Sequence, residues 1–224
     1  MIKICVSGSE GKMGSRIIDL AGSDPELEVA GGFDVDGNAE LGITACECLI
    51  DFTSPKAAME HLALCEKLKK SIVIGTTGLS EEEKSKIKEA SNNIPIVISP
   101  NMSVGVNLLF KLIEEASKVL GEDYEVNIVE AHHAEKKDAP SGTAKEIAKI
   151  VKSVKGDIEI PIDSIREGEI VGEHTITFES DVDLLEITHS AKTRDIFAKG
   201  ALKAAKFVAG RKSGLFTMKD VLAL

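Results

Sequence analysis

Short apolar runs alternate with segments of helical periodicity over the first hundred residues of the chain. Strands are predicted at the apolar runs, which cover residues 2–6, 29–33, 48–50, 71–74 and 94–98. Between these runs, apolar residues recur three and four positions apart, as they do on the buried side of an amphipathic helix. Strands that alternate with helices predict a parallel sheet with right-handed crossovers.

A loop follows each of the five predicted strands. These loops contain Gly8, Asp34, Phe52, Gly75 and Asn101. The carboxyl ends of parallel strands meet at one edge of a sheet, and ligands of such sheets bind beyond that edge. We therefore expect the five loops to converge on one binding cleft.

The pattern changes after residue 103. A long amphipathic helix is predicted over 104–120, then a strand over 126–129 and a helix that opens near Pro140. Later elements are predicted as strands at 158–160, 162–166, 174–180 and 184–188 and as a helix at 197–209. Several of these strands alternate apolar and polar residues, as a sheet with one covered face does. This half of the chain is predicted to be α+β, built on an open mixed sheet.

The turn after the first strand is rich in glycine. Gly8, Gly11 and Gly14 have the spacing G-x-x-G-x-x-G between a strand and a helix, the context of a dinucleotide-binding fingerprint. Glycines allow a tight turn and close approach of a pyrophosphate to the helix N-terminus; a purely structural turn is the alternative. The predicted fold class is α/β, a Rossmann-like dinucleotide-binding domain with a second α+β domain.

Asp34 follows the second strand about 20 residues after the last of these glycines, where a ribose-binding carboxylate belongs. The alternative interpretation is a plain turn. Val35 and Asp36 offer no cation to a 2′-phosphate, which favours NADH over NADPH. Lys12 is a nearby cation that would accommodate NADPH, so the expectation is a preference for NADH that does not exclude NADPH.

The stretch from residue 130 to 144 concentrates groups that carry charge and protons. His132 and Lys136 are proton donors whose pKa values respond to burial and neighbours. Ser141 is a natural N-cap, and Thr143 with Glu146 fits a capping box. Gly142 leaves room for a ligand at the positive end of the helix. The stretch predicts a pocket for a small, multiply anionic substrate, with an ordinary polar loop as the alternative.

A metal site is not predicted in this stretch. Adjacent residues of an extended chain point to opposite faces, so His132 and His133 are not expected to bind the same metal ion. The nearby sequence lacks the Cys or H-x₃-H spacing that completes a zinc site.

Composition narrows the choice of partners. The 224 residues carry a formal net charge of −10 and no Trp, which argues against nucleic acid and anionic membranes. None of the four cysteines forms a C-x-x-C motif. A strand is predicted from Ile2 onward, so no signal peptide is expected. The prediction is a cytoplasmic protein with reduced thiols and a small-molecule substrate.

The sequence E-A-H-H-x-x-K-x-D-A-P-S-G-T-A, beginning at Glu130, resembles the signature of the dihydrodipicolinate reductases (4-hydroxy-tetrahydrodipicolinate reductases) of lysine and diaminopimelate synthesis. This resemblance implies NAD(P)H-dependent reduction of 4-hydroxy-tetrahydrodipicolinate, or dihydrodipicolinate, to tetrahydrodipicolinate. It implies that His132 and Lys136 fill the acid role and that His133 binds a carboxylate. By the same resemblance Ser141, Gly142 and Thr143 hold a substrate carboxylate. Glu135 departs from the family pattern, which often has a basic residue there.

The resemblance extends to the cofactor motifs. The family form G-x-x-G-[RK]-M-G is matched by Gly8, Gly11, Lys12, Met13 and Gly14. The motifs D-F-T, G-T-T-G and N-M-S-V-G-V-N also recur in the family, and they imply cofactor contacts at Phe52, Gly75, Thr76, Thr77, Asn101 and Met102. An aromatic residue at a strand end is more often part of the core, which is the alternative for Phe52.

The family likeness also implies the domain plan and the assembly. The tail returns to the nucleotide domain, so residues 1–103 and 191–224 are expected to bind dinucleotide. Residues 104–190 are expected to bind substrate and to assemble a homotetramer through their sheet. Two other interpretations compete, a different two-domain nicotinamide dehydrogenase and a non-catalytic dinucleotide sensor. Neither explains the block from His132 to Thr143.

Overall fold

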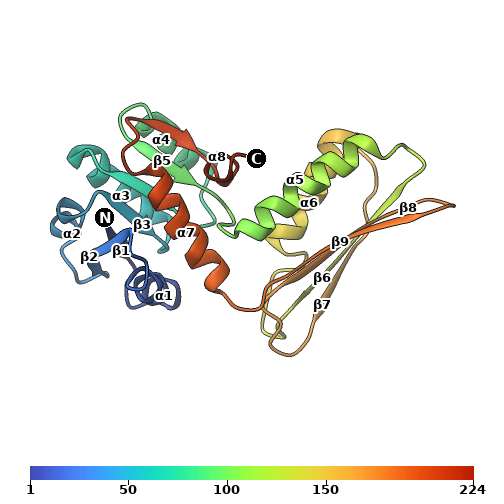
Figure 1. Ribbon diagram of the computed structural model, residues 1–224, viewed down its shortest axis with the longest axis horizontal. Coiled ribbons are helices and arrows are strands. Elements are labelled where there is room, and N and C mark those ends of the chain that lie inside the picture. The colour runs from blue at the N-terminus through green and yellow to red at the C-terminus, as the bar shows by residue number, and fades with distance from the viewer. The chain divides into compact units, whose positions relative to one another are not determined.

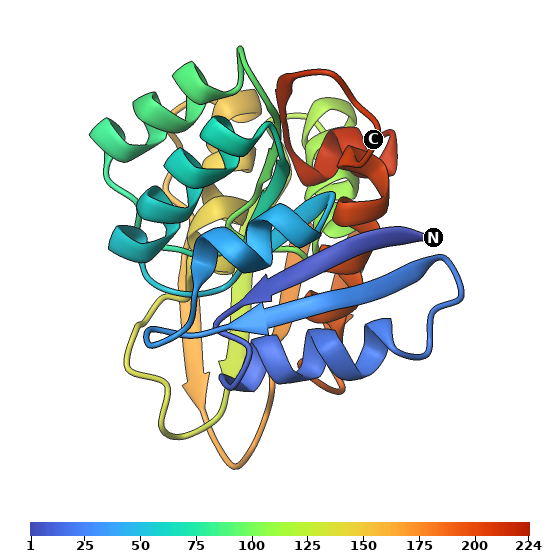
Figure 2. The same ribbon diagram turned by 90° about the vertical axis from the view of Figure 1, so that its left-hand side faces the viewer.

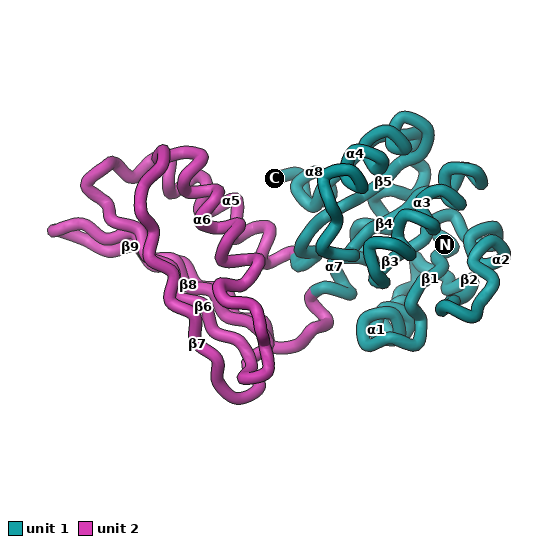
Figure 3. The backbone as a smooth tube through the Cα atoms, turned by 180° about the vertical axis from the view of Figure 1, so that it is seen from behind, with its two compact units in different colours: residues 1–103, 197–224 teal, residues 104–196 magenta.

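The computed structural model describes residues 1–224 and divides into two compact units (Figure 3). The first unit combines residues 1–103 with the tail 197–224, and the second comprises residues 104–196. The chain therefore leaves the first unit once and returns to it. None of its helices combines the length and apolar character that a bilayer span requires.

The first unit contains a six-stranded sheet in which every pairing is parallel (Figure 1). Its strand order is β10-β5-β4-β3-β1-β2. The strands are β1 (Ile2–Ser7), β2 (Leu27–Phe33), β3 (Cys48–Asp51), β4 (Ser71–Ile74), β5 (Pro95–Ile98) and β10 (Gly214–Phe216). Every residue of β3 and β4 is buried, because central strands of a parallel sheet are covered on both faces.

Helices cover both faces of this sheet (Figure 2). One face packs against α1 (Lys12–Ala21), α7 (Asp195–Val208) and α8 (Met218–Leu222). The other packs against α2 (Ala39–Ala45), α3 (Pro55–Leu68) and α4 (Glu81–Ala90). The predicted doubly wound α/β arrangement is confirmed.

The second unit is a four-stranded mixed sheet in the order β7-β6-β8-β9. Its strands are β6 (Glu125–His132), β7 (Ile162–Arg166), β8 (Glu173–Glu179) and β9 (Leu184–Ser190). Strand β6 pairs with β7 in parallel and with β8 in antiparallel register, and β8 pairs with β9 antiparallel. The predicted open mixed sheet is confirmed.

The two helices of this unit, α5 (Val104–Val119) and α6 (Gly142–Lys155), pack on one face of the sheet. The core contains Val126 and Ile128 of β6 and Ile176 and Phe178 of β8. The opposite face has no covering helix, and apolar side chains such as Ile165 and Leu184 are 44% and 54% exposed. Side chains alternate between the two faces along each strand, so even-numbered residues of β6 face the helices.

The structure differs from the predicted elements at four places. Residues 158–160 form no strand, because Ile158 and Ile160 pack against the core without pairing with a neighbouring strand. Helix α2 and strand β10 were not anticipated from the short segments that form them. Strand β6 extends to His132, which is therefore the last residue of a strand and not part of the following loop.

Candidate active site

The glycine turn after β1 has the geometry that a dinucleotide requires. Gly8 has φ +75°, and its carbonyl accepts the N–H of Gly11 at 3.0 Å. A Cβ added at Gly14 would lie 2.0 Å from the Gly8 carbonyl oxygen, so this position admits only glycine. Gly11 is the N-cap of α1 and offers no side-chain acceptor, which leaves N–H groups of the first turn available to an anion. Lys12 and Met13 are the first two residues of this helix.

Asp34 connects this turn to the end of β2. Its Oδ2 accepts the Ser9 hydroxyl at 2.6 Å and the Glu10 backbone N–H at 3.0 Å. Glu10 is exposed, and its backbone N–H, rather than its carboxylate, joins the turn to Asp34. Both of these hydrogen bonds use Oδ2, so they leave Oδ1 to a ligand hydroxyl.

A cleft of about 480 Å³ opens beyond the carboxyl ends of β1, β2 and β3. It is lined by Ser7, Gly8, Phe33, Asp34, Val35, Gly37, Ala39, Thr53, Ser54, Ala57, Glu60, His61 and Leu64. These residues include two carboxylates and no Lys or Arg. The cleft, the glycine turn and Asp34 together fit the adenosine half of a nicotinamide dinucleotide.

A buried carboxylate beneath the cleft was not anticipated from the sequence. Asp51 Oδ2 lies 2.6 Å from His61 Nδ1 and accepts the Ser7 hydroxyl at 3.0 Å. Its Oδ1 accepts the hydroxyls of Thr53 and Thr76 at 2.8 and 2.7 Å. Burial opposes ionisation of Asp51, but the hydrogen bonds from His61, Thr76 and Thr53 outweigh it and lower the carboxyl pKa. Asp51 thereby fixes the ends of β1, β3 and β4 at the edge of the sheet.

The remaining predicted cofactor residues lie near this edge with different exposures. A Cβ at Gly75 would lie 2.3 Å from the Phe52 ring, so the ring covers Gly75. Thr76 is buried against Asp51, and Thr77 is exposed. Asn101 Oδ1 accepts the Ser103 N–H at 2.9 Å. The Met102 side chain lies in the core of the first unit, which leaves only its backbone to meet a ligand.

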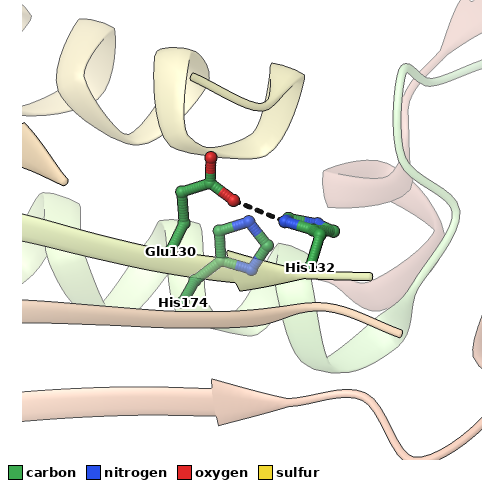
Figure 4. Close-up of side chains that lie close together, drawn as sticks. All are labelled: Glu130, His132 and His174. Atoms are coloured by element: carbon green, nitrogen blue, oxygen red, sulfur yellow. Dashed lines mark hydrogen bonds and ion pairs between the residues drawn. The ribbon is translucent and has the colours of Figure 1, made fainter. Parts of the chain in front are cut away.

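In the second unit, Glu130 of β6 is fully buried and contacts Arg166, Ser141 and His132. Figure 4 shows its carboxylate directed at the His132 ring. Arg166 of β7 donates Nη2–H to Oε1 at 2.7 Å and Nη1–H to Oε2 at 3.0 Å. The Ser141 N–H donates to Oε1 at 3.2 Å, and His132 Nδ1 contacts Oε2. Burial opposes ionisation, yet the hydrogen bonds from Arg166 and His132 outweigh it and hold the pKa of Glu130 at about 2.

His132 is buried beside Glu130, with its ring edge-on to His174 at a centroid distance of 5.2 Å. A Cβ at Gly172 would lie 3.0 Å from His132 Nε2, so the glycine keeps the space beside this nitrogen open. Burial lowers the pKa of His132; Glu130 opposes this shift, while Lys136 adds to it.

Lys136 lies in the loop after β6 and pairs with Asp138 at 2.7 Å. The Asp138 carbonyl in turn accepts Arg166 Nη2–H at 2.7 Å, so Arg166 also fixes the loop that carries Lys136. His133 is half-buried at the start of this loop, and Glu135 is exposed.

Ser141 is the N-cap of α6, as predicted, and its Oγ accepts the Ala144 N–H at 3.2 Å. The expected capping box between Thr143 and Glu146 is wrong, because Thr143 is already the second residue of the helix. A Cβ built at Gly142 meets no atom within 4 Å, so the N-terminus of α6 is open to a ligand at this point.

His174 of β8 also lies within this site, close to Ser141 and His132. Its Nε2 is 3.1 Å from Ser141 Oγ, and its Nδ1 is buried without a partner. Burial and the neighbouring His132 lower its pKa to about 4. A buried acceptor without a partner costs less than a buried N–H without one. We therefore assign the proton to Nε2, which donates to Ser141 Oγ.

Two family models cover nearly the whole chain. The model for the N-terminus of dihydrodipicolinate reductase matches residues 2–102, and the model for its C-terminus matches residues 105–222. The chain belongs to the dihydrodipicolinate reductase family. The resemblance read from the sequence is thereby confirmed, and the NAD(P)H-dependent oxidoreductases of this family act in lysine and diaminopimelate synthesis.

Curated relatives of this reductase family match end to end. The 4-hydroxy-tetrahydrodipicolinate reductase of Geotalea uraniireducens is 41% identical over an alignment of 266 positions, gaps included, that covers 100% of both chains. The enzyme of the same name from Dechloromonas aromatica is 41% identical over 263 positions, covering 99% of this chain and 98% of its own.

Solved structures show how widely the fold is shared. The dipicolinate-bound dihydrodipicolinate reductase of Paenisporosarcina sp. TG-14 has a TM-score of 0.87 at 23% identity and covers 99% of this chain and 100% of its own. DAP dehydrogenase of C. glutamicum has a TM-score of 0.62 at 12% identity, covering 99% of this chain and 93% of its own. The fold is thus common to several dehydrogenases, and the reductase family is distinguished by its sequence motifs.

Glu130, His132 and His174 bring potential metal ligands within 4.8 Å of one another. Both carboxylate oxygens of Glu130 already accept hydrogen bonds from the Arg166 guanidinium. A divalent cation at this point would lie beside a fixed positive charge and compete with it for the same lone pairs. The cluster is therefore a hydrogen-bonded network around an Arg–carboxylate pair.

Proposed function

We propose that the chain catalyses the NAD(P)H-dependent reduction of 4-hydroxy-tetrahydrodipicolinate to tetrahydrodipicolinate, in which the 4-hydroxyl group is lost as water before or during the reduction. The first unit binds the dinucleotide, and the second binds the substrate and assembles the oligomer. The observation that carries this proposal is the open N-terminus of α6 beside His132 and Lys136, which joins an anion site to two proton donors.

A cyclic dicarboxylate fits this arrangement. One carboxylate binds at the N-terminus of α6, where the Ser141 hydroxyl and the N–H groups of Gly142 and Thr143 are the proposed donors and the helix dipole favours an anion. The Ser141 Oγ accepts from both Ala144 N–H and, in the assigned tautomer, His174 Nε2–H, so its own hydrogen is free to donate. His133 and Lys136 bind the remaining anionic groups.

When bound, the nicotinamide supplies the hydride. Addition to a carbon conjugated with an imine develops negative charge on the substrate, and a cationic donor stabilises that charge and returns a proton. Burial lowers the pKa of His132, which favours its neutral form in the free protein near neutral pH. Lys136 therefore supplies the standing positive charge, and an anionic substrate raises the protonated fraction of His132.

NADH is the preferred cofactor in this proposal. The cleft beyond β2 presents the carboxylates of Asp34 and Glu60 and no Lys or Arg, so a 2′-phosphate there would find no ammonium or guanidinium group to balance its charge. The test is the ratio of kcat/KM for NADH and NADPH in the wild type and in Val35→Arg. Val35 is fully exposed, so the new cation should improve use of NADPH by about 10-fold without a folding cost. An unchanged ratio would contradict this assignment.

The uncovered face of the second unit's sheet is the proposed homotetramer interface. Its exposed apolar residues, among them Ile165 and Leu184, would be buried by the same face of another copy. Light scattering should give a four-chain mass for the wild type and a smaller mass for Ile165→Glu. Val119→Glu is the control, because Val119 is 81% exposed at the end of α5. A cytoplasmic location is part of the same proposal and agrees with four buried free cysteines.

The decisive assay follows the loss of nicotinamide absorbance while the preceding synthase generates substrate from pyruvate and aspartate semialdehyde. Wild-type protein should oxidise NADH rapidly, and Lys136→Ala should lose about 100-fold or more in kcat. The adjacent, exposed Lys137→Ala is the matched control and should retain activity. Intact cofactor binding without oxidation in the wild type would contradict the proposed reaction.

A further inference from the structure

The Glu130 carboxylate connects the proton donors of the proposed reaction with its anion-binding site. Glu130 contacts His132 through Oε2 and the N-cap of α6 through Oε1. Arg166 holds both oxygens and also donates to the Asp138 carbonyl of the loop that carries Lys136. The proton donors and the anion site lie on three successive elements, the end of β6, the following loop and the start of α6, and the Glu130–Arg166 pair contacts all three.

We propose that Glu130 and Arg166 are positioning residues of the reductase. Glu130 fixes His132 in the tautomer that carries hydrogen on Nδ1, so that Nε2 is the atom that takes up and delivers the proton. Arg166 fixes the Glu130 carboxylate and the loop of Lys136. This proposal rests on the proposed function for its chemistry, but the tautomer follows from the contacts of the free protein.

The tautomer follows from what each group can donate. Glu130 is ionised above a pKa of about 2 and is therefore only an acceptor. Its Oε2 contacts His132 Nδ1, so Nδ1 must carry the hydrogen of that bond. Nε2 is then left unprotonated in the neutral ring, with Gly172 beside it and no side chain in the space that a Cβ would fill. The hydrogen-bond partner of Nδ1 thus determines that Nε2 is the nitrogen able to accept a proton.

Arg166 explains why the carboxylate stays ionised and stays in place. A buried carboxylate without a cation would take up a proton or turn toward solvent. Two hydrogen bonds from one planar guanidinium fix both the charge and the orientation. Lysine offers a point charge and cannot make both contacts in this geometry.

The charges around His132 set the direction of its pH response. They are Glu130 on its own strand, Arg166 on β7, His174 on β8 and Lys136 in the following loop. Among them Glu130 raises the pKa of His132, whereas Lys136 and Arg166 lower it. Removing the Glu130 charge should therefore move the His132 titration to lower pH.

The variant Glu130→Gln distinguishes a positioning role of Glu130 from a purely structural one. The glutamine carbonyl still accepts the Ser141 N–H, while its NH₂ group now faces His132 Nδ1 and makes that nitrogen an acceptor. The tautomer should invert, with hydrogen on Nε2. We expect kcat to fall about 100-fold, KM to change much less, and the fall of kcat with rising pH to occur at lower pH.

The experiment measures the tautomer by nitrogen-15 NMR of histidine-labelled full-length protein, with His132→Gln used for assignment, and the pH profile of kcat. Expected results are Nδ1–H in the wild type, Nε2–H in Glu130→Gln and a pH limb shifted downward in that variant. Asp24→Asn is the control: it removes an ion pair to Lys206 in the other unit and should leave tautomer and profile unchanged.

An Nε2–H tautomer in the wild type, or an unshifted pH profile in folded Glu130→Gln, would overturn the proposal. If Glu130→Gln does not fold, Glu130→Gln/Arg166→Met removes the unpaired cation, and the wild-type tautomer alone remains decisive. The proposed reaction is tested separately, since wild-type protein that shows Nδ1–H but oxidises no NADH keeps the positioning geometry and loses the reaction.

Discussion

Asp51 and Glu130 are both buried carboxylates near the carboxyl end of a strand, and each contacts a histidine through Nδ1. The difference lies in their other partners. Asp51 accepts hydroxyls from Ser7, Thr53 and Thr76, whereas Glu130 is held by the Arg166 guanidinium. Neutral hydroxyls suit a site that holds the ends of three strands in one geometry beside the proposed dinucleotide site. A fixed cation suits a site that must keep its carboxylate ionised while a neighbouring histidine exchanges protons.

The largest expected difference between the two regions is in stability. Glu130→Ala leaves the largely buried Arg166 guanidinium without its carboxylate and should lower the free energy of unfolding by about 3–5 kcal/mol. Asp51→Asn keeps a polar group against the same hydroxyls and should lower it by about 1–3 kcal/mol. The measurement is urea denaturation followed by Tyr124 fluorescence and by circular dichroism.

Tyr124 is the chain's single tyrosine and lies in the second unit, and the chain has no Trp, so its fluorescence reports on that unit alone. Glu130→Ala should move the fluorescence transition, while Asp51→Asn should move mainly the circular dichroism transition. Equal losses of unfolding free energy in the two variants would show that the Arg166 cation beside Glu130 does not change the cost of removing the carboxylate.

The second prediction concerns pH and the histidine next to this pair. His174 has a pKa of about 4 in the folded protein, below its ordinary value of 6.5. The unfolded chain therefore binds more protons between these values, and stability falls as pH drops from about 6.5 to 4. The loss attributable to this group should reach about 2–3 kcal/mol by pH 4.

Denaturation of the wild type and of His174→Gln at pH 7 and at pH 4.5 checks this assignment. Glutamine can still donate to Ser141 Oγ but does not titrate, so the variant should lose less stability between the two pH values. An equal loss in both proteins would place the acid sensitivity elsewhere.

The third prediction breaks the dinucleotide site and leaves the second unit intact. Gly14→Ala would place a methyl group 2.0 Å from the Gly8 carbonyl oxygen and distort the turn. NADH affinity, measured by fluorescence titration, should fall by about 10-fold or more, because the helix N-terminus no longer meets the pyrophosphate. Gly31→Ala is the matched control, since a Cβ there meets no atom within 4 Å. Equal affinities in the two variants would exclude the turn as the binding element.

The sequence predicted the layers of this fold well and the buried networks poorly, for one physical reason. Strand and helix periodicity is local, so the parallel sheet and the glycine turn could be read from short windows. Strand β10 and helix α2 are short and carry little periodicity, and Ile158 and Ile160 look like a strand although they only pack against a core.

The candidate site shows the same limit. The block from His132 to Thr143 could be recognised because its residues are close in sequence. Glu130 stands in that block, yet its role depends on Arg166, 36 residues away on the neighbouring strand, and on the register that pairs His132 with Arg166. Asp51 and Ser7 are 44 residues apart. Strand register is set by the whole sheet, so a pattern within one strand could not reveal either network.

The smallest expected effect tests the space beside His132 Nε2. Gly172→Ala adds a methyl group 3.0 Å from this nitrogen, close enough to crowd a substrate atom but far from Nδ1 and Glu130. The Nδ1–H tautomer should persist, and kcat should fall by about 10-fold, the loss expected when a proton donor is displaced from its best geometry. The wild-type tautomer with reduced kcat would place the reacting proton at Nε2. Full activity in this variant would place it away from that face of His132, and Lys136 would then be the group that delivers the proton.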